Sequence, residues 1–204
     1  MYIAKKNKAL SDEAVIEFIN KYGFGILISH VDSQFEAVHI PMEYYNSGGK
    51  HMIHGHVALG NKLTHAIEKS SEVMAIFSEP HAYISSSWYD HVNVPTWNYI
   101  AVHAYGKIRK LEAEELHDSI KSLVDRYEDG LPGRFDISDM PEDMLQAHLN
   151  GVTGFEIMVE RFESNFKLSQ NRNDKNFANI INHLEQSENL YDREISEEML
   201  KTRS

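Results

Sequence analysis

Residues 96–111, "TWNYIAVHAYGKIRKL", form the longest run in this 204-residue sequence that is typical of a single β-strand. Aromatic and β-branched side chains recur through the run, and these side chains pack well on a pleated surface. The alternation of strand and helix that builds a parallel sheet is absent from the sequence. Long strands separated by few turn signals therefore predict a small closed or split β-barrel.

The flanking sequence predicts further strands and a few helices. Phe24, Ile26 and Ile28 alternate as on a half-buried strand, as do residues 38–42. A turn at "NSGG" leads into a third strand, "KHMIHGHV", and "GVTGFEIMVERFES" is the last strand. Ser11 and Asp174 are expected to cap helices, and residues 116–127 have the apolar period of another. Residues 128–143 carry two prolines and two glycines and are predicted to be a loop.

The fold class expected is therefore mainly β with helices, α+β. We expect one barrel domain over residues 1–186, followed by a polar, helical C-terminal tail over residues 187–204. No apolar run approaches 18 residues and the first 15 residues lack an apolar signal core, so a cytoplasmic protein without a membrane span is expected.

Charge and composition narrow the classes of function. The formal net charge is −11 with neutral histidine, and an acidic chain repels a phosphate backbone at long range. Direct DNA binding is therefore not expected, and no helix-turn-helix with a basic recognition helix is evident. The chain has no cysteine, which excludes disulfides and thiol nucleophiles and fits a reducing compartment.

A cluster of hydrogen-bond donors contrasts with this acidic background. The segment "FKLSQNR", residues 166–172, places Lys167, Ser169, Gln170, Asn171 and Arg172 within six positions after the last strand. An arginine fork beside amides suits a phosphate or a carboxylate. A solvated loop is the alternative, because these residue types are also common in turns.

Two further stretches are candidate binding sites. His54 and His56 share one face of the third strand and could line a groove or bind a metal, although the spacing reveals no third ligand. Asn61 and Lys62 follow at the start of a short helix, where an anion is favoured. On the long strand, Trp97 lies on the opposite face from Thr96 and Asn98, either for packing or for stacking on a planar ring.

The motifs "IHGHVA", "HAYISSSWY", "VPTWNYIAVHAYG", "GFEI" and "FKLSQNR" occur in an order and at separations that resemble the PaiB family, also called FMN-binding negative transcriptional regulators. The resemblance runs from "MYI" to the helix after Arg172. It implies an FMN-binding split β-barrel, similar to pyridoxamine-phosphate oxidases, that acts as a homodimer with the flavin at the dimer interface.

The resemblance also implies where FMN or another small anionic ligand binds. The segment from His54 to Lys62 corresponds to the usual place for phosphate contacts, and we expect Lys167, Gln170 and Arg172 to face the groove. The implied cofactor-binding residues are His54, His56, Asn61, Lys62, Thr96, Trp97, Asn98, Lys167, Gln170 and Arg172. No catalytic residue is evident. The alternatives are an FMN-dependent oxidoreductase on the same barrel and a haem- or metal-binding protein.

Overall fold

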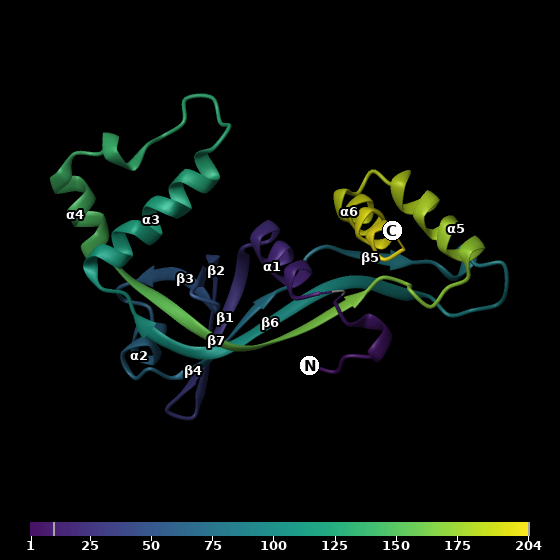
Figure 1. Ribbon diagram of the computed structural model, residues 1–204, viewed down its shortest axis with the longest axis horizontal. Helices are drawn as coiled ribbons and strands as arrows, with labels where there is room; N and C mark the ends of the chain where they lie inside the picture. Colours follow the sequence, from purple (N-terminus) through teal and green to yellow (C-terminus); the bar gives the residue numbers. More distant parts are fainter. Residues whose placement is uncertain (10, 204) are drawn as a thin grey trace. The chain divides into compact units, whose positions relative to one another are not determined.

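The computed structural model describes residues 1–9 and 11–203. Within these residues the chain forms seven strands and six α-helices (Figure 1). The strands are β1 (Phe24–Val31), β2 (Gln34–Ser47), β3 (Lys50–Ala58), β4 (Glu72–Phe77), β5 (His81–Ile84), β6 (Thr96–Lys110) and β7 (Val152–Lys167). The helices are α1 (Asp12–Lys21), α2 (Leu63–Glu68), α3 (Ala113–Glu128), α4 (Glu142–Asn150), α5 (Asp174–Glu185) and α6 (Leu190–Lys201).

The strands form one sheet in the order β4-β1-β2-β3-β7-β6-β5, and β4 also pairs with β6. This second pairing closes β4, β1, β2, β3, β7 and β6 into a ring in which each strand has two neighbours, and β5 pairs with β6 outside the ring. The pairings of β1 with β2, of β2 with β3 and of β3 with β7 are antiparallel. The barrel predicted from the long strand pattern is confirmed.

Contacts divide the chain into two compact units. We call residues 23–76 and 104–162 the barrel unit, and residues 1–22, 77–103 and 163–203 the terminal unit. The strands β6 and β7 contribute residues to both units. Short 3₁₀ segments, Lys5–Asn7 and Ser86–Trp88, belong to the terminal unit, and Ile137–Asp139 belongs to the barrel unit.

The barrel unit has an apolar interior in which alternate residues of each strand point inward. Leu27, Ile53, Phe155 and Ile157 are fully buried there. On β1 the buried positions are Gly25, Leu27 and Ser29, whereas Phe24 is 62% exposed. The alternation of Phe24, Ile26 and Ile28 correctly predicted a strand, but those side chains lie on its less buried face.

Helices at the two ends of the sequence belong to the terminal unit. The hydroxyl of Ser11 caps α1 as predicted, by accepting a hydrogen bond from the Ala14 N–H at 3.2 Å. The cap of α5 is Asn173, one residue before the predicted Asp174, and its side chain accepts from the Asn176 N–H at 2.9 Å. Helices α5 and α6 lie side by side near β5 (Figure 1).

The tail predicted over residues 187–204 contains α6. This helix is polar in sequence, but one of its faces is buried. Ile195 and Met199 are completely buried and Ser196 is 2% exposed. A helix with such a face takes part in the core of its unit. The boundary at residue 186 stays a prediction. Within the described residues, no helix is long and apolar enough to cross a membrane.

Candidate functional site

A polar pocket in the terminal unit is lined by all five residues of the C-terminal donor cluster. Its volume is about 180 Å³, and we call it the cationic pocket. It lies between the loop that follows β7, the start of β6 and the 3₁₀ segment near the N-terminus. The lining residues are Lys6, Asn7, Val94, Pro95, Thr96, Asn98, Lys167, Ser169, Gln170, Asn171 and Arg172. Three of these side chains are basic, and the described lining includes no acidic one.

The loop after β7 is fixed by its own side chains. The Leu168 N–H donates to Gln170 Oε1 at 2.9 Å, the Gln170 amide nitrogen donates to the Phe166 carbonyl, and the Arg172 N–H donates to the Ser169 carbonyl at 3.0 Å. Ser169 has a φ of +60°, a left-handed conformation that costs free energy for a residue other than glycine. Gln170 therefore shapes the loop that presents its neighbours to the pocket.

Asn98 links this loop to the core of the terminal unit. Its side chain is fully buried, and its Oδ1 accepts a hydrogen bond from the Ser169 hydroxyl at 3.0 Å. Its Nδ2 donates to the Met199 sulfur on α6 at 3.3 Å. With both groups of its amide satisfied, Asn98 holds β6, the loop and α6 together.

Lys167 and Arg172 supply the positive charge. The Lys167 ammonium donates to Thr96 Oγ1 at 2.7 Å. Burial lowers the pKa of Lys167, and the nearby charges of Lys6 and Arg172 lower it further. Like charges that converge in a partly buried place repel one another, and an anion bound between them would relieve that repulsion.

Arg172 holds a donor that is buried without a protein partner. Its guanidinium carbon lies 4.4 Å from the centre of the Tyr89 ring, which orients the side chain by a cation–π contact. Its Nε atom is buried and has no hydrogen-bond partner among the described residues. An unsatisfied buried N–H costs about 1–3 kcal/mol, so this atom marks a place where a ligand acceptor is favoured.

The histidines of β3 belong to the barrel unit, where His54 contacts a network of acidic and basic side chains. His54 Nε2 lies 2.8 Å from Glu156 Oε2, and the other Glu156 oxygen accepts from Arg109 Nε at 2.8 Å. Arg109 also holds Glu115 of α3 with both terminal nitrogens, at 2.8 and 2.9 Å. His54 thus already has a protein partner that ties it to a structural network.

The side chain of His56 is partly buried. Burial lowers its pKa, so the neutral imidazole is favoured. Within residues 1–9 and 11–203, no group of three or more His, Asp or Glu side chains is arranged to hold a metal ion.

The predicted anion site at the start of α2 has its polar groups engaged elsewhere. Asn61 Oδ1 accepts from the Leu63 N–H at 2.9 Å. The Lys62 ammonium lies 3.2 Å from Glu36 Oε1, and its side chain is 76% exposed. A cofactor role for these two residues, and for His54 and His56, stays a prediction.

Trp97 does not line the cationic pocket. Strand alternation directs it away from Thr96 and Asn98, as the sequence predicted. It is 51% exposed, and its ring makes an edge-to-face contact with Tyr83 of β5, with 5.6 Å between the ring centres.

Sequence reasoning missed the N-terminal part of the cationic pocket. Lys6 and Asn7 lie about 160 residues before the donor cluster in the sequence and still line the same pocket. The run "KKNK" at residues 5–8 was the available signal, because basic residues are in the minority in this chain.

The comparisons with known proteins agree with this architecture. Residues 1–161 match the family model described as "Putative FMN-binding domain". The chain is 36% identical, over 98% of its length and 96% of the relative's length, to "Protease synthase and sporulation protein PAI 2" of Bacillus subtilis. An uncharacterized protein of Aspergillus fumigatus is 32% identical over 51% of this chain and 48% of its own length.

Solved structures show the same fold at low sequence identity. The FAD and heme binding protein of Mycobacterium smegmatis superposes with a TM-score of 0.61 at 11% identity, over 83% of this chain and 78% of that one. The conserved hypothetical protein Rv2991 of Mycobacterium tuberculosis superposes with a TM-score of 0.60 at 16% identity, over 85% and 94%. The family model and the full-length similarity to PAI 2 together show that this chain belongs to the FMN-binding split-barrel family of PaiB-like proteins.

Proposed function

We propose that this protein binds FMN and acts as a PaiB-like negative regulator of transcription, through a ligand or partner rather than through direct contact with DNA. Family membership supports the flavin, and the acidic balance of the chain supports indirect action. The single observation that carries the location of the site is the cationic pocket, with its converging Lys167 and Arg172.

The pocket suits the phosphate group of FMN. Lys167 offers a compact ammonium charge, and Arg172 offers a planar guanidinium that can donate two hydrogen bonds to one phosphate. The Thr96 hydroxyl lies beside the Lys167 ammonium. The unsatisfied Arg172 Nε fits a phosphate oxygen, which accepts hydrogen bonds strongly. The bound flavin would supply redox chemistry, and the protein would supply binding and orientation.

Flavin binding can be measured by titrating the purified protein with FMN and with riboflavin, which lacks the phosphate, while following flavin absorbance and fluorescence. We expect Lys167→Ala and Arg172→Ala each to weaken FMN binding about tenfold or more, because charge-assisted hydrogen bonds contribute roughly 1.5–3 kcal/mol. Riboflavin binding should change little. Lys50→Ala, which removes an exposed lysine of the barrel unit, is the matched control.

Two results would count against this site. If both variants bind FMN as the unmodified protein does, the phosphate lies elsewhere, and Lys62→Ala would then test the start of α2. If FMN and riboflavin bind equally well to the unmodified protein, the pocket does not recognise the phosphate. Thermal unfolding of each variant separates loss of binding from loss of folding.

We also propose that the protein is a homodimer in the cytoplasm. Large apolar side chains are exposed on β5, β6 and the segment between them, including Tyr83, Val92, Val94 and Trp97. Exposed apolar groups of this kind support an interface with a second copy. Light scattering after size exclusion should give twice the 23.5 kDa mass of one chain, and a monomer at micromolar concentration would contradict the proposal. The absence of cysteine fits a reducing compartment.

A further inference from the structure

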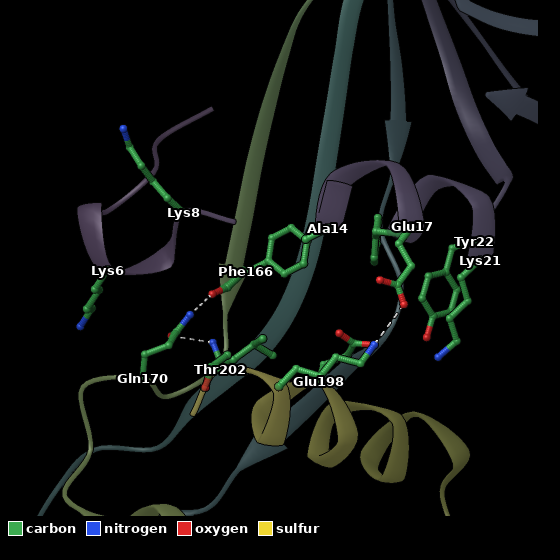
Figure 2. A pocket seen from close by; sticks show the side chains of 13 residues that line it. Lys6, Lys8, Ala14, Glu17, Lys21, Tyr22, Phe166, Gln170, Glu198 and Thr202 are labelled. Atoms are coloured by element: carbon green, nitrogen blue, oxygen red, sulfur yellow. Dashed lines mark hydrogen bonds and ion pairs between the residues drawn. The ribbon is translucent and has the colours of Figure 1, made fainter. Parts of the chain in front are cut away.

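A second pocket in the terminal unit has a different character from the cationic pocket. Its volume is about 260 Å³, and we call it the aromatic pocket (Figure 2). Residues of α1, α6, the end of β7 and the N-terminal segment form it. Nothing in the flavin site described above uses its apolar interior.

Three rings form the apolar wall. Phe18 lies 5.0 Å from Tyr22 and 5.8 Å from Phe166, measured between ring centres, in tilted and edge-to-face arrangements. Ala14 and Leu168 complete the wall, and the small Ala14 side chain leaves space on α1. Burial, together with the charge of Glu194, raises the pKa of Tyr22, so its phenol stays neutral. Ring faces and edges of this kind bind apolar or aromatic groups.

The charged residues around the wall leave an excess of positive charge. Four lysines and two glutamates line the pocket. Both glutamates, Glu17 on α1 and Glu198 on α6, lie against the Lys201 ammonium, at 3.5 and 3.0 Å. Lys21 lies 3.6 Å from Glu194. Lys6 and Lys8 line the N-terminal side of the pocket, and their side chains extend away from Phe166 in Figure 2. Their positive charge favours an anion nearby, in a chain whose net charge is −11.

We propose that the aromatic pocket binds a small amphipathic carboxylate, with the apolar body against the three rings and the carboxylate near the N-terminal lysines. An apolar wall alone would accept a neutral molecule, and the lysines alone would accept any anion. The combination selects a molecule that has both parts, such as a medium-chain or aryl-alkyl carboxylate.

The two pockets share Lys6 and Gln170, which makes energetic coupling between them expected. Gln170 fixes the loop that presents Arg172, and Lys6 adds charge beside Lys167. A carboxylate that draws Lys6 toward the aromatic pocket would change FMN affinity, and FMN would change carboxylate affinity by the same factor. This coupling rests on the proposed function, whereas carboxylate binding itself does not.

Calorimetric titration of the flavin-free protein with hexanoate, octanoate and decanoate tests the binding directly. Each buried methylene contributes about 0.8 kcal/mol, so affinity should rise about fourfold per methylene until the pocket is full. Decanol and decylammonium should bind at least about tenfold more weakly than decanoate, because they lack the negative charge.

Two substitutions probe the two parts of the pocket. Ala14→Phe fills the space on α1 without a change of charge and should weaken decanoate binding about tenfold or more. Ala147→Phe, at an exposed position of α4, is its control. Lys8→Glu should weaken decanoate but not decanol, and Lys50→Glu is the control for that change in net charge.

Several results would overturn the proposal. These are non-saturable binding, equal affinity for decanoate and decylammonium, or decanoate affinity unchanged by both Ala14→Phe and Lys8→Glu. Decanoate binding that survives Lys167→Ala and Arg172→Ala supports a separate site even if FMN fails to bind. If FMN and decanoate exclude each other completely and Ala14→Phe abolishes both, the pocket belongs to the flavin and the proposal of a second ligand is wrong.

Discussion

The backbones of β6 and β7 approach each other closely at Gly106 of β6. A Cβ atom added at Gly106 would lie 2.1 Å from the Met158 carbonyl oxygen and 2.8 Å from the Met158 carbonyl carbon, both in the backbone of β7. A backbone atom cannot move aside as the end of a flexible side chain can. The distance between β6 and β7 at this point therefore depends on the absence of a side chain.

We predict that Gly106→Ala lowers the free energy of unfolding by about 3 kcal/mol, because the strands must separate locally to admit the methyl group. Gly60→Ala is the matched control, since a Cβ there meets nothing within 4 Å. Urea denaturation of both variants measures the difference. If Gly106→Ala is as stable as Gly60→Ala, β6 and β7 do have room for a methyl group at this position, and the prediction is wrong.

The carboxylate of Glu115 connects α3 to Arg109 of β6. Arg109 and the Glu112 backbone N–H lower the pKa of Glu115 to about 2. Glu115 also completes a capping box at the start of α3. Because the pKa is lower in the folded state, the contribution of Glu115 is fully present above its ordinary value of 4.5 and is lost as pH falls through about 2.

We predict that Glu115→Gln lowers the free energy of unfolding by about 0.5 kcal/mol at pH 7, a small amount because the side chain is partly exposed. Glutamine can still accept the capping hydrogen bond, so the change isolates the charge. The difference from the unmodified protein should be constant above pH 5 and should shrink between pH 4.5 and 2. Urea titrations across this range provide the check, and a difference independent of pH would contradict the ion pair.

At the scale of helices and strands, α6 shows how composition can mislead. The segment "SENLYDREISEEMLKTRS" is polar overall, yet Ile195 and Met199 recur four residues apart and are completely buried. Two apolar residues at helical spacing are enough to give one buried face. We therefore infer that the terminal unit needs α6 for stability.

We predict that Ile195→Ala lowers the free energy of unfolding by about 3 kcal/mol, since it leaves a cavity in a fully buried position. Leu200→Ala, on the same helix but 50% exposed in the native protein, should cost less than about 1 kcal/mol. Removal of residues 187–204 should be more damaging than either. A truncated protein as stable as the full chain would support a domain boundary at residue 186.

The sequence predicted the elements whose periodicity is long and regular, such as β6, β7 and α3. It did not reveal α4, which follows a loop rich in glycine and proline and has Leu145 as its buried side chain. It predicted Thr96, Asn98, Lys167, Gln170 and Arg172 as candidates, and all five line one pocket. It could not show that Lys6 joins them, because that proximity depends on tertiary structure, nor that the Gln170 amide is engaged by its own loop.

On the scale of the whole molecule, β6 and β7 each contribute several residues to both units. Each of these strands runs from one unit into the other, and the two strands are neighbours in the sheet. If β6 and β7 lost their structure in one unit, the parts of the same two strands in the other unit would lose their continuation. Such sharing favours a single cooperative transition over independent unfolding.

We predict that unfolding followed by tryptophan fluorescence and by far-ultraviolet circular dichroism gives the same midpoint. Trp88 and Trp97 are the two tryptophans of the sequence, and both belong to the terminal unit, whereas circular dichroism reports on both units. Parallel urea titrations with the two probes provide the measurement. Separate midpoints would mean that the units unfold independently.

The position of the two tryptophans also has an optical consequence. Trp97 lies between Thr96 and Asn98 in the sequence, and both of these neighbours line the cationic pocket. The other tryptophan, Trp88, stacks on His183 with 4.7 Å between ring centres. A flavin bound there would absorb the light that Trp97 emits, so energy transfer would quench the intrinsic emission as the site fills. Intrinsic tryptophan fluorescence would therefore report how much of the pocket is occupied by flavin, without a dye or an engineered residue.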